Sequence, residues 1–169
     1  MKKLSNRHSD KRIKYYGYDI SEDMVKIAKK NNFINKNLHF QKKDLTKLNL
    51  KKCDFVTSLF TIQFIEPKNR QKIFNEIYSK LNWGGAFIIC EKIRGKDARF
   101  QDIINFLYFD FKKRNKLSEV EILNKENALR GSLEPFTYQA NIDYLKRAGF
   151  KDIMPLYQYL CFVGILAIK

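Results

Sequence analysis

Asp19 and Asp44 are the two side chains of this 169-residue sequence whose type and spacing best suit the binding of a nucleoside. Asp19 ends the apolar run 15–18, and Ser21 then begins an expected helix with acids in its first turn. A carboxylate at the end of such a strand commonly accepts hydrogen bonds from ribose hydroxyls. The alternative is an acid that stabilises the N-terminus of the following helix and binds no ligand.

Asp44 lies in the polar loop that follows the next expected strand. An acid at this place can accept a hydrogen bond from the adenine amino group, while the adjacent amide contacts the edge of the ring. One helix and one strand separate Asp19 from Asp44, and this spacing favours a site for S-adenosylmethionine (SAM) over one for NAD. Taken alone, Asp44 is an ordinary loop residue.

No other pattern in the sequence identifies catalytic residues, so these stay unknown. Gly84 and Gly85 follow a helix and precede a strand, the reverse of the order in a phosphate-binding loop. His8 and His39 are too few and too distant from the cysteines for a metal site, so no metal is expected. Glu91 stands at the carboxyl end of an expected strand, where α/β sheets bind ligands, and is a candidate for contact with substrate.

The elements that must position these side chains alternate between strands and helices. Strands are expected over 14–20, 37–41, 53–60, 86–91, 152–158 and 159–168, with the last two as an antiparallel pair. Helices are expected over 22–32, from Pro67 to about residue 81, over 100–111, over 118–130, and from Pro135 to just before Gly149. This order predicts one α/β domain, residues 1–169, with a mainly parallel sheet.

Folds of this kind place a further strand and a Gly-rich turn before the strand that ends in Asp19. Only about a dozen residues precede that strand in this sequence. We therefore expect the first strand to be missing and the domain to be truncated at its N-terminus.

The composition is that of a basic globular chain, with 44% hydrophobic residues and a net charge of +15. The charge suggests RNA binding, but Lys outnumbers Arg 25 to 8 and is spread along the chain, as in proteins from genomes poor in G and C. No apolar run reaches the roughly 18 residues that span a bilayer, and no secretory signal is recognised. Three separated cysteines in apolar segments indicate free thiols in a reducing cytoplasm.

Several segments together resemble the carboxy-S-adenosyl-L-methionine synthase family. The resemblance runs from about residue 14 to the end, and its most specific part is Phe-Thr-Ile-Gln-Phe-Ile-Glu-Pro at 60–67. The other matching segments are 17–21 (Gly-Tyr-Asp-Ile-Ser), 44–45 (Asp-Leu), 81–86, 91–92 (Glu-Lys), 110–112, 118–122 and 145–150.

The resemblance implies a Rossmann-like class I SAM-dependent methyltransferase fold and a transferase that converts SAM to carboxy-SAM using prephenate. A partner enzyme would then use the product to modify the wobble uridine of tRNA. By this resemblance Asp19 and Ile20 contact the ribose, and Asp44 and Leu45 contact the adenine. SAM or carboxy-SAM is the implied cofactor, and a homodimer is the implied assembly.

The sequence departs from the family at three places. The family's first strand and Gly-rich loop have no counterpart here. Leu59 replaces an Asn that contacts the cofactor. By ungapped spacing, Glu126 replaces the Arg that binds the extra carboxylate, and an acid there would repel it. Arg130, one helical turn later, is the candidate substitute.

Two hypotheses from different classes follow for function. The chain is either a SAM-dependent enzyme impaired by truncation, or a non-catalytic remnant or partner subunit that another chain complements. A third reading, a module that binds tRNA through charge alone, predicts binding that weakens steeply with salt.

Overall fold

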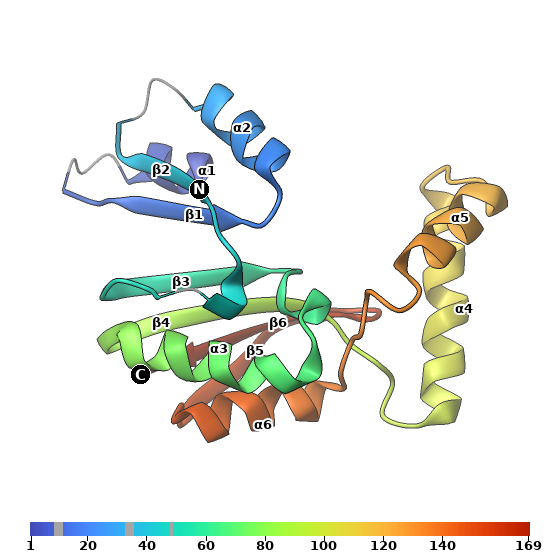
Figure 1. Cartoon of the computed structure of the whole chain (residues 1–169). Helices are drawn as coiled ribbons and strands as arrows, with labels where there is room; N and C mark the ends of the chain where they lie inside the picture. The colour runs from blue at the N-terminus through green and yellow to red at the C-terminus, as the bar shows by residue number, and fades with distance from the viewer. Residues whose placement is uncertain (9–11, 33–35, 48) are drawn as a thin grey trace. The chain divides into compact units, whose positions relative to one another are not determined.

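The computed structural model describes residues 1–8, 12–32, 36–47 and 49–169. These residues form two compact units, Met1–Asn49 and Leu50–Lys169, which are described in turn (Figure 1). The single domain expected over 1–169 stays a prediction.

The first unit contains a two-stranded parallel sheet and two helices. Strand β1 (Tyr15–Asp19) pairs with β2 (Leu38–Lys42), so that Tyr15 lies opposite Leu38 and Asp19 opposite Lys42. Helix α1 (Lys2–Arg7) precedes β1, and helix α2 (Glu22–Lys30) connects the strands, with a short 3₁₀ turn η1 (Leu45–Lys47) after β2. The parallel register brings the carboxyl ends of β1 and β2 to the same edge of the sheet.

Helix α2 begins where its sequence predicts. The Ser21 hydroxyl accepts a hydrogen bond from the Met24 amide, at 3.3 Å, and satisfies a helix-terminal donor. Glu22 and Asp23 occupy the first turn, where they complement the helix dipole. Only Val25 of this helix is buried, whereas Met24 and Ile27 are exposed in the described chain.

The second unit is built on a mixed four-stranded sheet in the order β3-β4-β6-β5. Strand β3 (Cys53–Leu59) runs parallel to β4 (Leu81–Lys92), and β6 (Phe162–Ile168) pairs antiparallel with both β4 and β5 (Asp152–Tyr159). The expected antiparallel pair at the end of the chain is therefore confirmed. Strand β3 lies at an edge of the sheet as described.

Helices α3 (Pro67–Lys80) and α6 (Tyr138–Ala148) lie side by side against one face of this sheet (Figure 1). The core between them is aromatic and aliphatic. The ring of Phe74 packs against Phe87 of β4 and stacks on Tyr144 of α6, with centroids 6.1 and 5.3 Å apart. Phe74, Phe87 and Leu145 are fully buried. This packing fixes β4, whose carboxyl end carries Glu91 and Lys92.

Two further helices form a hairpin, α4 (Ala98–Arg114) and α5 (Glu119–Leu129), shown in Figure 1. Asp97 caps α4 by accepting from the Phe100 amide, at 3.0 Å. Ser118 and Glu121 form a reciprocal capping box at the start of α5.

Several expected boundaries differ by a few residues in the structure, and backbone pairing or capping explains two of these differences. Strand β4 begins at Leu81, because Leu81 pairs with Cys53 of β3, and Gly84 and Gly85 bond to the backbone of Lys169 rather than forming a free turn. Helix α6 begins at Tyr138 and not at Pro135, because Thr137 is its N-cap and accepts from the Ala140 amide. Gly149 ends that helix with a φ of +116°, as expected for a glycine cap.

Candidate functional site

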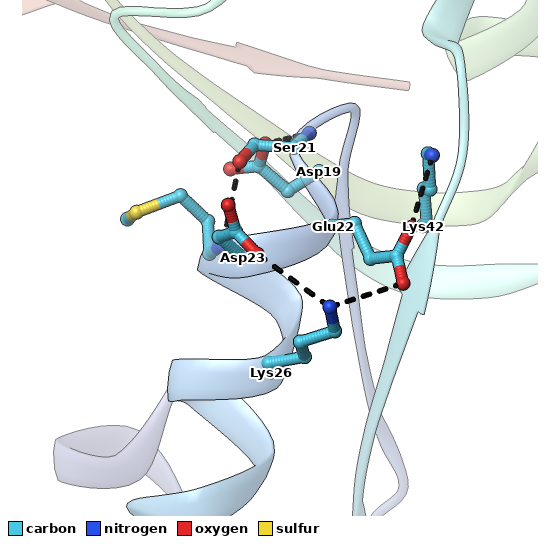
Figure 2. Close-up of polar contacts among 7 residues, drawn as sticks. Asp19, Ser21, Glu22, Asp23, Lys26 and Lys42 are labelled. Atoms are coloured by element: carbon cyan, nitrogen blue, oxygen red, sulfur yellow. Dashed lines mark hydrogen bonds and ion pairs between the residues drawn. The ribbon is translucent and has the colours of Figure 1, made fainter.

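Asp19 stands at the carboxyl end of β1 and is exposed to solvent. Its Oδ1 accepts a hydrogen bond from the Ser21 amide, at 2.8 Å, which orients the carboxylate at the start of α2 (Figure 2). Ile20, between them, is also exposed. Asp19 is thus held by a neighbour two residues away and faces solvent, as a ligand contact must.

Asp44 lies in the loop after β2, which is bonded to the end of β1. The Lys43 amide donates to the carbonyl oxygen of Asp19, at 2.9 Å, so the loop after β2 is fixed to the end of β1. Asp44 Oδ1 accepts from the amide and the hydroxyl of Thr46, at 2.9 and 2.8 Å, and these bonds lower the pKa of Asp44. Leu45, like Asp44, is half-buried.

A charged network surrounds the start of α2. Glu22 lies between Lys26 and Lys42, at 3.2 and 3.4 Å, and these lysines lower its pKa (Figure 2). Asp23 also pairs with Lys26, at 3.6 Å. Lys26 and Lys42 are thus paired with Glu22 and Asp23. Asp19 takes part in none of the ion pairs found in the described residues, so its carboxylate has no ion-pair partner there that a ligand would have to displace.

In the second unit, Leu59 ends β3 and is 57% exposed. Its register partner on β4 is Cys90, whose carbonyl accepts from the Phe60 amide at 2.7 Å. Leu59 therefore lies at the carboxyl end of the parallel pair, and its contact with a cofactor stays a prediction. Phe60 has a φ of +55°, in the left-handed region that few side chains adopt.

Glu91 is 3% exposed, and its two oxygens are used by backbone amides. Oε1 accepts from Ile62 at 3.1 Å and Oε2 from Gln63 at 2.9 Å, in the 3₁₀ turn η2 (Ile62–Phe64). Burial raises the pKa of Glu91 to about 7, in spite of these donors and the nearby Arg70. In the structure this carboxylate positions the turn after β3; contact with substrate stays a prediction.

Gln63 and Arg70 extend the same buried cluster, which sequence reasoning did not find. Gln63 Oε1 accepts from the Lys92 amide at 2.7 Å. Arg70 donates to the carbonyls of Ile65 and Gln63, at 2.7 and 3.1 Å, and its guanidinium lies over the ring of Phe136. No local pattern marks Arg70, because its neighbours Asn69 and Gln71 are also polar.

Glu126 and Arg130 both belong to the end of the α4–α5 hairpin. Glu126 pairs with Lys112 of α4, at 2.7 Å. The lysine side chain is 10% exposed and the glutamate 59%. The acid expected to repel a carboxylate is thus neutralised by a lysine fourteen positions earlier. Arg130 is the exposed C-cap residue of α5.

A shallow cavity of about 190 Å³ lies between the turn η2 and the loop that follows α5, next to Glu66 and Glu134. It is smaller than the roughly 300 Å³ of a typical small-molecule pocket. Among the described residues, no three His, Cys, Asp or Glu side chains could jointly hold a metal ion. No helix of the described chain is long and apolar enough to cross a membrane.

Comparison with known sequences identifies a methyltransferase domain over residues 2–89. The carboxy-S-adenosyl-L-methionine synthase of Staphylococcus epidermidis is 37% identical over 155 residues, which cover 92% of this chain and 68% of that protein. The enzyme of the same name from Campylobacter jejuni is 34% identical over 167 residues, 98% of this chain and 70% of its own length. The chain thus spans about two thirds of the length of these relatives.

Solved structures agree on the fold. Human N-acetylserotonin methyltransferase in complex with SAM matches 99% of this chain and 43% of its own, with a TM-score of 0.66 and 18% identity. An O-methyltransferase family 2 protein from Planctomyces limnophilus matches 99% of this chain over 47% of its own length, with a TM-score of 0.67 and 12% identity. The expected methyltransferase-type α/β fold and the resemblance stated from the sequence are both confirmed.

Proposed function

This chain belongs to the carboxy-S-adenosyl-L-methionine synthase family, and on that premise we propose that it binds SAM and forms carboxy-SAM from SAM and prephenate. The methyl group of SAM would gain the carboxylate of prephenate, with phenylpyruvate and water released. The product would serve wobble-uridine modification of tRNA in the cytoplasm.

The observation that carries this proposal is the placement of Asp19 and Asp44. Both follow neighbouring parallel strands, at the same edge of the β1–β2 sheet, and the Lys43 amide ties their loops together. Carboxyl ends of parallel strands are where α/β sheets bind nucleotides. We assign Asp19 and Ile20 to the ribose, and Asp44 and Leu45 to the adenine.

Leu59, at the end of β3, is proposed as a cofactor contact from the resemblance to the family alone, without the polar contact of the Asn that it replaces. Arg130 is proposed as a substrate contact. Its exposure at the end of α5 leaves its guanidinium accessible to a carboxylate in a bidentate geometry.

Calorimetric titration of the full chain with SAM tests the cofactor assignment, and incubation with SAM and prephenate followed by mass spectrometry tests the reaction. Saturable SAM binding that weakens in Asp19→Ala and persists in Asp23→Ala is expected. Asp23 is a matched control because it is an exposed acid on the same helix start. No binding of SAM by the wild-type chain would refute the proposal.

A second candidate function is a subunit that another chain completes. Strand β3 is an edge strand of the described sheet and carries the exposed apolar residues Phe55 and Leu59. An apolar edge of this kind can pair with a further strand, in a homodimer or a mixed complex. Light scattering of the purified chain distinguishes the two: a monomer that binds SAM excludes a need for a second subunit.

Direct contact with tRNA is a separate proposal that rests on the net charge of +15. Binding through lysines alone should fall steeply as salt rises, because it depends on counterion release. Retention of tRNA affinity at high salt would contradict it.

A further inference from the structure

Lys92 and Lys112 approach the same aromatic ring from two elements of the second unit. The Nζ of Lys92, the last residue of β4, lies 5.1 Å from the ring centroid of Tyr108. The Nζ of Lys112 lies 4.5 Å from the same centroid. Tyr108 belongs to α4, one helical turn before Lys112. Two ammonium groups therefore converge on one half-buried ring.

The surroundings of this pair are aromatic. Phe162 contacts both Tyr108 and Phe60, with ring centroids 5.3 and 5.7 Å apart. Phe162 is also the register partner of Lys92 across the β4–β6 pair. Because Phe60 directly follows β3, the cluster lies at the carboxyl ends of β3 and β4, where α/β folds bind ligands.

The charges of the cluster do not balance. Lys112 is paired with Glu126, at 2.7 Å, whereas Lys92 takes part in none of the ion pairs found among the described residues. Glu91, its neighbour on β4, is turned to the amides of η2. Cys161 also lies close, and burial raises the pKa of its thiol. One positive charge thus remains uncompensated in half-buried aromatic surroundings.

We propose that Lys92 and Lys112 bind the carboxylate of a small ring-bearing organic acid, whose ring packs on Tyr108 and Phe60. The inference rests on the proposed function, since prephenate is such an acid. Lysines supply point charges that suit a carboxylate, and aromatic faces supply the apolar surface that its ring requires.

Glu126 has a defined part in this site. Its carboxylate occupies Lys112 when no ligand is present, and its exposure allows it to swing into solvent when a ligand carboxylate arrives. Glu126 is therefore a competitor for Lys112. Removing its charge should strengthen binding of the acid only where Lys112 is present, whereas simple repulsion would act with or without that lysine.

The test is calorimetric titration of the full chain with prephenate and with phenylpyruvate, and separately with SAM. Lys92→Gln should weaken binding of both acids roughly tenfold or more, as expected for loss of a hydrogen bond to a charged group. Lys113→Gln, an exposed lysine of the same helix that pairs with Glu119, is the matched control and should leave affinity unchanged.

A double-mutant cycle completes the test. Glu126→Gln should tighten binding several-fold in the wild-type chain and have no effect in a Lys112→Gln background, with circular dichroism used to confirm folding of each variant. Equal affinities of Lys92→Gln and wild type, or no saturable binding of either acid, would overturn the proposal. SAM binding without acid binding would reject this site alone, and acid binding without SAM binding would reject the proposed function alone.

Discussion

Replacing Glu91 with Gln should change how the stability of the chain depends on pH. The carboxylate is 3% exposed and holds the η2 turn through the amides of Ile62 and Gln63. Burial raises its pKa from an ordinary value of 4.5 to about 7. Glutamine has nearly the same shape but no charge, so the substitution removes the titration and retains most of the packing.

The magnitude follows from linkage between protonation and folding. Between about pH 4.5 and 7 the folded chain holds a proton on Glu91 that the unfolded chain has released. The unfolded state therefore binds fewer protons, and stability falls as pH rises through this window and levels off above it. The difference between the two pKa values corresponds to about 3 kcal/mol of unfolding free energy.

The assay is urea unfolding of wild type and Glu91→Gln at several pH values from about 4.5 to 8.5. Circular dichroism is the suitable signal, because the single tryptophan, Trp83, is 89% exposed and reports little on the core. All other titrating groups are common to both chains, so the difference between their free energies isolates Glu91. Relative to wild type, the variant should gain about 3 kcal/mol between the ends of this range.

Glu66→Gln is the matched control, since Glu66 lies in the same segment with an exposed side chain paired to Lys68. Its curve should run parallel to that of wild type. If the Glu91→Gln curve is also parallel to wild type, the carboxylate does not titrate in this window and the reasoning about its burial is wrong.

Three further outcomes are expected. Asp44→Ala should weaken SAM binding about tenfold, measured by calorimetry, while Asp23→Ala should not. Arg70→Met should lower the unfolding free energy in urea by about 1–3 kcal/mol, because it removes the donor to the half-buried Ile65 carbonyl, whereas the Gln63 carbonyl keeps the Glu134 amide. Gly149→Ala should lower the melting temperature more than Gly131→Ala. Both glycines have a positive φ, but only at Gly149 would the new Cβ lie 2.7 Å from the Tyr78 ring. Equal losses in melting temperature would refute this account.

The local signals of the sequence predict the elements well. The Ser21 cap, Pro67 at the first turn of α3 and Gly149 at the end of α6 mark helix boundaries that the structure retains within a few residues. These signals work because the hydrogen bonds involved join residues two to four positions apart. The start of β4 at Leu81 was missed, since it depends on pairing of Leu81 with Cys53 and of Gly84 and Gly85 with Lys169, all distant in the chain.

The candidate site residues also differ in whether local sequence or distant contacts determine their surroundings. Asp19 and Asp44 could be paired from the sequence because one parallel register brings their strands together. The ion pair of Lys112 with Glu126 could not, because it depends on how α4 and α5 fold back on each other. Spacing alone could therefore name Glu126 but not its partner Lys112, and the place of Glu126 in a substrate site stays a prediction.

Asp19 and Glu91 show what decides whether an acid near the end of a strand is available to a ligand. Both follow apolar runs, but only Asp19 is followed within two residues by a helix N-cap, Ser21. Asp19 takes its hydrogen bond from Ser21, two positions away, and keeps its exposure. Glu91 takes its bonds from amides 28 and 29 positions away, and the turn that brings them also buries it. A carboxylate satisfied by its own segment can still meet a ligand, whereas one satisfied by a distant segment holds that segment in place.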